Sequence, residues 1–239
     1  MKKSLLLIAL GALAFTGCKI DNYDAPDAKV FGSILDVKTG ELVCTNTNQG
    51  NSIHVIEHGY ENPGNQYWVI KNTGEYRNNF VFSNTYTVSF ENCNFFPVEP
   101  KDYTIKKGDN QIDFTVTPYL RILNPSVTRS GNTIVAKFHL EAGDPSKVNT
   151  VRSVQLFAFS DIHVSNQIKY NISGGGDSLS PSETVDPSKE YTLTIDIDQN
   201  KNNFKYTGKN YYFRIGAIAS GEGFGEIRWN FSPLVKITF

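Results

Sequence analysis

Apolar and polar residues alternate with a period of two along much of this chain. In residues 191–197 every second side chain is apolar, and Thr192, Thr194 and Asp196 lie between them. A β-strand points successive side chains to opposite faces, so this alternation predicts a strand with one buried face. Residues 85–90 and 111–116 alternate in the same way. Because no long run rich in Ala, Leu, Glu and Lys interrupts the series, the pattern predicts an all-β protein.

Turn-forming sequences separate the predicted strands and divide them into two groups. Gly40 and Gly74 lie in short polar segments, where glycine can adopt the positive φ of a tight reversal. Pro118 cannot continue a central ladder, and the alternation restarts after it. We therefore expect two consecutive all-β domains, at 28–117 and 118–239. The expected strands lie at 30–37, 53–56, 67–71, 80–82, 85–90 and 111–116 in the first domain, and at 119–123, 133–140, 151–159, 191–197, 210–219 and 234–239 in the second.

The first 18 residues have the organisation of a secretory signal. Lys2 and Lys3 precede an apolar run at 5–15, and the small residue Gly17 precedes Cys18. As a helix the run would be about 16 Å long, whereas the hydrocarbon core of a bilayer is about 30 Å thick, so it is too short to span. These residues predict a signal peptide at 1–17 and a polar tether at 18–27. An ordinary signal peptide that happens to contain Cys18 is the alternative.

The end of this segment, Phe15-Thr16-Gly17-Cys18, resembles the lipobox of bacterial lipoproteins. Phe15 stands where that family usually carries Leu. The resemblance implies cleavage before Cys18 and acylation of its sulfur and amino group. Several acyl chains together hold a protein at a membrane almost permanently. We therefore expect the membrane, through a lipid anchor at Cys18, to be one partner of this protein.

Composition narrows the classes of partner further. The chain of 239 residues has 23 Lys and Arg, two of them in the expected signal peptide, against 24 Asp and Glu. No basic stripe is present for nucleic acid or for anionic lipid head groups. Aromatic residues make up 13% of the chain, with 12 Tyr and 16 Phe, which again favours strands.

Cysteine and histidine are too sparse to predict a metal site. Cys44 and Cys93 remain after Cys18, and an oxidising compartment permits a disulfide between them, although two buried thiols are an equally open alternative. Neither cysteine has a second ligand at zinc spacing. His54 and His58 lack the helical His-Glu arrangement of zinc peptidases, because Val55 follows the first histidine. We expect no metal.

No catalytic arrangement stands out in the sequence. The nucleophile motif Gly-x-Ser-x-Gly is absent, and carboxylate pairs such as Asp196 and Asp198 are expected on a solvated surface. Gly221, Gly223 and Gly225 resemble a phosphate loop only by count, because a strand pattern and not a helix follows them. We therefore expect neither an enzyme nor a bound cofactor.

Two groups of residues are candidates for ligand binding. Trp and Tyr rings can stack on the C–H faces of sugars while side-chain amides bind the hydroxyls. The alternative is that most of these aromatic residues belong to the cores of the two domains. The candidates are Trp68, Tyr60 and Tyr67 in the first domain, and Trp229, Arg228 and Asn230 in the second.

Short motifs in each domain resemble known β-sandwich families. In the first domain, 28–117 is similar to the carboxypeptidase-regulatory, transthyretin-like sandwich. The second domain resembles a fibronectin type III or immunoglobulin-like sandwich. The motifs are Gly32-x-Ile34-x-Asp36, Thr39-Gly40-Glu41, Gly74-Glu75-Tyr76 and Tyr86-Thr87-Val88 in the first domain, and residues 211–217, Trp229 and Ser232-Pro233-Leu234-Val235 in the second.

Together with the lipobox, these two domains resemble a family of two-domain lipoproteins of the Bacteroidetes that is associated with starch-utilisation-type glycan import. The resemblance implies an accessory protein anchored in the outer membrane and exposed at the cell surface. Its implied partners are a polysaccharide or oligosaccharide and an outer-membrane importer complex. The alternative is a structural or assembly adaptor that docks to an outer-membrane partner without binding glycan.

Overall fold

A computed structural model describes residues 24–46, 51–225 and 227–239. The expected signal peptide at 1–17 and the expected acylation site Cys18 lie outside the described residues. Within them every regular element is a β-strand, which confirms the all-β prediction, and no helix has the length and apolar character needed to cross a membrane. The first domain contains β1 (Ala28–Asp36), β2 (Ser52–Glu57), β3 (Asn65–Val69), β4 (Glu75–Val81), β5 (Thr85–Glu91), β6 (Lys101–Thr104), β7 (Gly108–Gln111) and β8 (Phe114–Val116).

The first domain is a sandwich of two sheets. One has the order β4-β1-β7, with β8 also paired to β1, and the other has the order β3-β2-β5-β6. Alternation places Tyr86 and Val88 of β5 in the core, as predicted, while Thr87 between them lies on the outer face. Trp68 of β3 is only 2% exposed and stacks on Tyr76 of β4, with 6.2 Å between the ring centroids. The core thus lies between the sheets and is rich in aromatic rings.

The second domain is also built from two sheets. One has the order β14-β10-β9, and the other has the order β12-β11-β15-β16, with β13 paired to β11 and β17 paired to β15. Tyr191, Leu193 and Ile195 of β14 are buried, as the alternation predicts. The strands are β9 (Leu120–Ser130), β10 (Thr133–Ala142), β11 (Val148–Phe159), β12 (Ser178–Leu179), β13 (Glu183–Thr184), β14 (Tyr191–Asp196), β15 (Asn210–Gly221), β16 (Asn230–Phe231) and β17 (Val235–Thr238).

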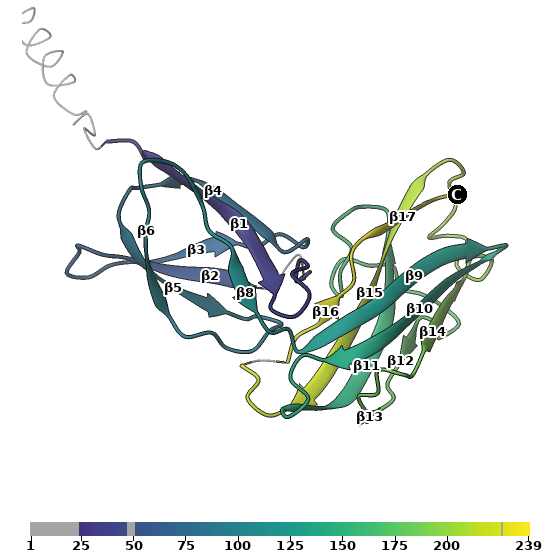
Figure 1. Cartoon of the computed structure of the whole chain (residues 1–239). Helices are drawn as coiled ribbons and strands as arrows, with labels where there is room; N and C mark the ends of the chain where they lie inside the picture. Colours follow the sequence, from purple (N-terminus) through teal and green to yellow (C-terminus); the bar gives the residue numbers. More distant parts are fainter. Residues whose placement is uncertain (1–23, 47–50, 226) are drawn as a thin grey trace, which may run out of the picture.

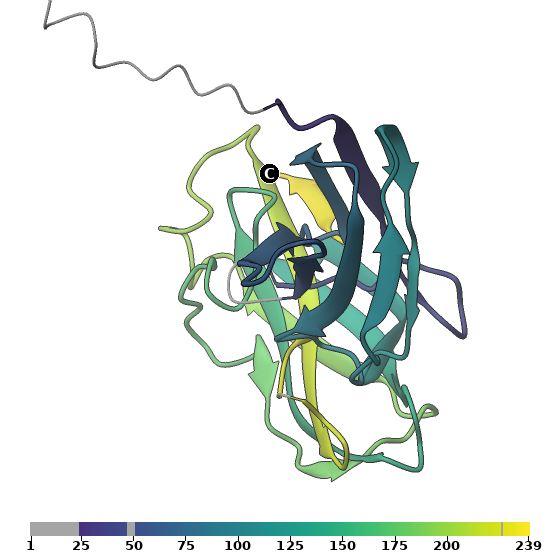
Figure 2. The same cartoon turned by 90° about the vertical axis from the view of Figure 1, so that its left-hand side faces the viewer.

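The two domains lie side by side (Figure 1), and buried contacts between their side chains form an interface. Figure 2 views the molecule from the side of the first domain, with the second domain behind it. A small core of its own joins them, because Cys44 of the first domain packs with Phe157, Val164 and Phe231 of the second. β1 begins at Ala28, at the end of the first domain that lies away from the second (Figure 1). The interface therefore holds the two sandwiches in one fixed arrangement.

Buried asparagines add directional bonds to this interface. Asn94 Nδ2 donates to the carbonyl oxygens of Cys44, at 2.9 Å, and Trp229, at 3.1 Å. Asn230 Nδ2 donates to the carbonyl of Asn94 at 2.8 Å, and its Oδ1 accepts from the amide of Leu120 at 3.1 Å. Buried amides with every partner in place fix one geometry, since any shift would leave polar groups unpaired.

Candidate functional site: a cavity between the domains

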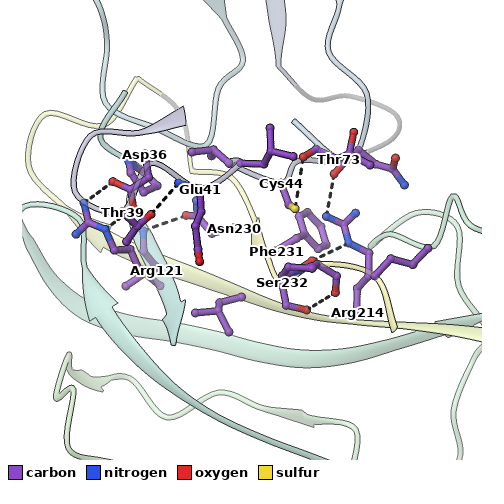
Figure 3. Close-up of a pocket in the computed structure, with 18 of the residues that line it drawn as sticks. Asp36, Thr39, Glu41, Cys44, Thr73, Arg121, Arg214, Asn230, Phe231 and Ser232 are labelled. Atoms are coloured by element: carbon purple, nitrogen blue, oxygen red, sulfur yellow. Dashed lines mark hydrogen bonds and ion pairs between the residues drawn. The ribbon is translucent and has the colours of Figure 1, made fainter. Parts of the chain in front are cut away.

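A cavity of about 660 Å³ lies at the junction of the domains. Cavities of this size between domains are typical small-ligand sites, mostly apolar with a few polar groups. The first domain contributes the turn after β1 and the loop before β4, and the second contributes β9 and the segment that contains β16 (Figure 3). Its walls include Glu41, Leu42, Val43, Cys44, Thr73, Leu120, Ile122, Leu123, Ile162, Phe231, Pro233 and Leu234.

Two tight turns of the first domain form one wall of the cavity. Gly40 has φ +71°, and its amide donates to the carbonyl of Asp36 at 2.8 Å, which closes the turn after β1. Gly74 has φ +95°, and a Cβ there would lie 2.7 Å from the carbonyl oxygen of Val43. Only glycine combines this conformation with this close approach, so the wall depends on Gly74.

Arg121 of β9 marks one end of the cavity. Its Nη2 donates to Asp36 Oδ1 at 2.8 Å, its Nε bonds the other oxygen of Asp36, and its Nη1 donates to Glu141 Oε1 at 2.9 Å. Burial raises the pKa of Asp36, but the bonds from Arg121 and the amide of Lys38 outweigh it, so the pKa lies below its ordinary value. The hydrogen bond to Asp36 chiefly raises the pKa of Arg121. This end is a compensated ion pair between the domains.

Arg214 of β15 lies at the opposite end of the drawn group of side chains (Figure 3). Its guanidinium donates to the carbonyls of Thr45 at 2.9 Å, Asn72 at 3.1 Å and Ser232 at 3.2 Å. It also lies 4.3 Å over the ring of Phe231. Among the described residues no carboxylate pairs with it, and burial lowers the pKa of Arg214 to about 10. This end is a buried cation held by neutral acceptors.

The remaining cavity surface is aliphatic with one carboxylate. Leu42, Ile162 and Leu234 are 41%, 47% and 36% exposed and present their side chains at the walls. The side chain of Glu41 extends into the space (Figure 3). In the described part of the chain no hydrogen bond engages its carboxylate. The arrangement can pack against an apolar part of a ligand, while the Glu41 carboxylate accepts a hydrogen bond from a donor elsewhere on the same ligand.

The structure separates the six residues that the sequence suggested for ligand binding. Trp68 is a core residue of the first domain, which is the alternative that the sequence left open for these aromatic residues. Tyr60 and Tyr67 are 61% and 48% exposed, but they do not line the cavity. Tyr67 lies on the outer face of β3, with its ring 5.1 Å from that of His54.

The three candidates of the second domain belong to the interface. Asn230 lines the cavity, but both ends of its amide are engaged in the network with Asn94 and Leu120. The half-buried Trp229 packs edge-on against Phe157, with 5.1 Å between the ring centroids. Arg228 Nη2 donates to Asn92 Oδ1 at 3.0 Å, which is another bond between the domains. These residues therefore position the site and offer it few free polar atoms.

Cys44 and Cys93 both retain their thiols, so the disulfide considered from the sequence is not formed. They lie in different clusters, Cys44 in the interface core and Cys93 in the core of the first domain. Cys44 Sγ contacts the carbonyl of Thr73 at 3.6 Å, whereas Cys93 Sγ contacts that of Glu91 at 3.3 Å. Burial raises the pKa of the Cys44 thiol, which keeps it protonated.

His54 and His58 each contact a hydroxyl of β5. His54 Nδ1 lies 3.1 Å from Ser89 Oγ, and His58 Nε2 lies 2.8 Å from Thr87 Oγ1. Across the described ranges, no group of three or more His, Cys, Asp or Glu side chains is arranged to hold a metal ion.

The residues that build most of the cavity were not among the ligand-binding candidates that the sequence suggested. Arg214 carried a signal, because it is the one charge in a strand whose two faces are otherwise apolar. Such a strand predicts that both of its faces are covered. Arg121 and Glu41 carried no comparable signal, because their role depends on how the domains dock.

Two β-sandwiches locked together around a cavity define a two-domain all-β protein with a candidate ligand site at the domain junction. The particular family follows from sequence comparison. The chain belongs to the DUF3823 family. The model described as "Protein of unknown function (DUF3823) N-terminal domain" matches residues 28–117, and "Domain of unknown function (DUF3823_C)" matches residues 120–236. Among curated proteins, none matches the chain.

Solved structures of Bacteroidetes proteins share the whole architecture. One, described as a "putative carbohydrate binding protein" from Bacteroides uniformis ATCC 8492, is 50% identical with a TM-score of 0.84, covering 90% of this chain and 100% of that chain. A DUF3823 family protein from Parabacteroides merdae ATCC 43184 is 20% identical, with a TM-score of 0.73 and coverage of 90% and 100%. Another, from Bacteroides ovatus ATCC 8483, is also 20% identical, with a TM-score of 0.71 and coverage of 88% and 98%. The last two show the fold alone.

Proposed function

We propose that this protein is a non-enzymatic glycan-binding protein and that the cavity between its domains is the binding site. The observation that carries the proposal is the cavity itself, of about 660 Å³, walled by aliphatic side chains and held open by two buried arginines. A cavity whose walls are fixed before binding costs little ordering entropy when a ligand enters. The 50% identical protein described as a "putative carbohydrate binding protein" supports a sugar as the ligand.

The proposal includes an anchor in the outer membrane. Acylation of Cys18 would attach the protein at the cell surface, and the short segment before β1 would join the anchor to the first domain. β1 starts at the end of that domain remote from the second domain, so an anchor there leaves the cavity accessible. A surface-anchored sugar binder would serve as an accessory to an outer-membrane importer of glycans.

Calorimetric titration with a panel of polysaccharides and oligosaccharides tests the binding role. We expect at least one glycan to bind, and Leu234→Trp to abolish its binding by filling the cavity from the 36% exposed wall position. Leu179→Trp is the matched control, because Leu179 is 45% exposed on β12 and outside the cavity. Failure of every glycan to bind, or equal binding by the Leu234→Trp variant, would contradict the proposal.

Metabolic labelling with palmitate in a Bacteroidetes host tests the anchor separately. We expect label on the native protein and on Cys44→Ala, and no label on Cys18→Ala. The native protein should also fractionate with outer membranes. Recovery of the native chain in the aqueous fraction with an unmodified Cys18 would refute the anchor.

An adaptor role is a second candidate, because large apolar side chains are exposed on the first domain. Phe80 is 81% exposed, Val69 is 69% exposed and Phe82 is 42% exposed. Exposed apolar groups of this size can mark a protein-binding surface. Co-purification of one outer-membrane protein that Phe80→Ser abolishes, together with no binding to any glycan, would favour this role over the first.

A further inference from the structure

The polar side chains at the cavity are already committed to the protein. Arg121 uses its guanidinium on Asp36, Glu141 and the carbonyls of Ala142 and Gly143. A guanidinium is a strong donor to the carboxylate or sulfate group of a ligand. To bind one, Arg121 would have to leave Asp36, which is itself only 5% exposed.

Arg214 is equally unavailable to a ligand. It is 1% exposed, and its Nε, Nη1 and Nη2 atoms each donate to a backbone carbonyl. Withdrawing any of these bonds would leave a buried carbonyl unpaired at the interface. The cavity therefore contains two cations but offers neither to an anionic ligand.

The uncharged polar side chains are committed as well. Ser232 Oγ accepts from the amide of Ile215 at 3.0 Å and donates to the carbonyl of Pro233 at 3.0 Å. Thr73 Oγ1 donates to Glu75 at 3.0 Å, and Asn72 Nδ2 donates to the carbonyl of Ile162 at 2.9 Å. With both ends of the Asn230 amide also bonded, the ligand meets few free donors.

Glu41 is the exception. Its backbone amide bonds Thr39 Oγ1 at 3.2 Å and its carbonyl accepts from Asp36 at 2.9 Å, so the backbone is fixed while the carboxylate extends into the cavity (Figure 3). A carboxylate accepts hydrogen bonds from hydroxyls and repels anions. It supplies one strong acceptor at an otherwise aliphatic site.

This supply of polar groups limits the kind of sugar that fits. A sugar with hydroxyls on every carbon would bring several polar groups against the aliphatic side chains of Leu42, Ile122 and Leu234, which offer no hydrogen bond in return. A methyl or acetyl group in the same place would instead pack against these side chains. Among the described residues of the walls the aromatic ring is that of Phe231, which at 7% exposure is too buried to stack on the face of a sugar.

We propose that the cavity binds an uncharged sugar residue that carries a methyl or acetyl group, such as a 6-deoxy or N-acetylated sugar, with one of its hydroxyls donating to Glu41. The proposal rests on the proposed function of this cavity as a glycan site. The apolar substituent enters between the aliphatic side chains of the two domains, and Glu41 orients the sugar ring at the rim. Acidic sugars are excluded because both arginines are engaged and Glu41 repels them.

Calorimetry of the purified protein with matched sugar pairs tests this selectivity. The probes are L-fucose against L-galactose, N-acetylglucosamine against glucose, and galacturonate against galactose. We expect the deoxy or acetylated member of at least one pair to bind at least tenfold tighter, or about 1.4 kcal/mol, and galacturonate to show no binding. Leu234→Trp should remove binding, and Leu179→Trp should keep it.

Glu41→Gln separates the two parts of the proposal. We expect it to weaken the preferred sugar about fivefold or more while the ratio within the preferred pair stays the same, because the apolar walls are unchanged. If the two members of every pair bind with equal, measurable affinity, or if galacturonate binds as tightly as the preferred sugar, the inferred selectivity is wrong while the glycan site stands. Absence of binding by all of these sugars and by the polysaccharide panel would overturn the proposed function and the selectivity with it.

Discussion

The two arginines at the domain interface, Arg121 at 7% and Arg214 at 1% exposure, are both buried but held in opposite ways. Arg121 meets Asp36 and Glu141, and the hydrogen bond to Asp36 chiefly raises the pKa of Arg121. Arg214 meets carbonyl oxygens and the ring of Phe231 without a carboxylate partner among the described residues, and burial lowers its pKa to about 10. One is an ion pair and the other is an uncompensated cation in a cradle of backbone acceptors. The same type of side chain therefore joins the two domains in one place by charge pairing and in another by directional hydrogen bonds. The Arg121 contact and the Arg214 contact should therefore respond differently to substitution and to pH.

The largest effect is expected from Arg121→Met. It leaves the 5% exposed Asp36 without its counter-ion, which should cost about 3–5 kcal/mol in the free energy of unfolding. The double variant Arg121→Met with Asp36→Leu should recover much of this loss, because neither charge is then left buried alone. Urea unfolding followed by tryptophan fluorescence measures both. If the double variant were as unstable as Arg121→Met alone, the ion pair between Arg121 and Asp36 would not be what stabilises the contact between the domains.

Arg214→Met should destabilise the protein somewhat less. It removes donors from the carbonyls of Thr45, Asn72 and Ser232, at about 1–3 kcal/mol in total once water reaches some of them. Arg214→Lys should recover only part, since an ammonium cannot reach three carbonyls in fork geometry. Because no acidic partner exists among the described residues, no single acid-to-neutral substitution should rescue it. If Asp36→Asn restored the stability of Arg214→Met, the distinction between an ion-paired Arg121 and an Arg214 held by neutral acceptors would be wrong.

Low pH should weaken the ion pair between Arg121 and Asp36 and leave the hydrogen bonds from Arg214 to backbone carbonyls unchanged. The folded-state pKa of Asp36 lies below its ordinary value of 3.8, so its contribution is fully present above that value. The contribution is lost as the pH falls through the lower, folded pKa. Unfolding free energies measured from pH 5 to pH 2 should therefore fall more steeply for the native protein than for Asp36→Asn. Parallel curves would exclude Asp36 as a source of acid sensitivity.

The smallest effect is expected from Glu141→Gln. The Glu141 side chain is 19% exposed and shares its charge between Arg121 and Lys38, so the amide keeps one hydrogen bond and loses only part of the attraction. We expect a loss of about 0.5–1 kcal/mol. Thermal unfolding at low and high salt provides the check, with the difference from the native protein shrinking as salt rises. If Glu141→Gln lowered the free energy of unfolding as much as Arg121→Met does, Glu141 and not Asp36 would be the main partner of Arg121.

The sequence predicted the fold better than the site, for a physical reason. Alternation is a local property, so it identified the buried face of β5 and of β14 correctly. Aromatic residues near Asn-rich segments gave a misleading signal, since Trp68 serves the core of the first domain. The disulfide between Cys44 and Cys93 could be neither predicted nor excluded, because it depended on their separation in space.

The cavity depends on docking, which no local pattern encodes. Glu41 and Leu234 are far apart in the sequence and become neighbours of one space only when the domains meet. Arg214 could have indicated a covered outer face, but nothing along the chain showed which surface covers it. The resemblance to transthyretin-like and fibronectin-like sandwiches, and the association with glycan import, remain predictions.

Methyl NMR titration of the protein with the glycan that binds most tightly tests the central claim most directly. If the cavity is the site, the methyl signals of Leu42, Ile122 and Leu234 will shift in a saturable manner, while those of Leu179 and Ile56 will remain unchanged. Shifts confined to residues outside the cavity, such as Ile56 on the outer face of β2, would contradict the account and place sugar binding on the outer face of the β3-β2-β5-β6 sheet.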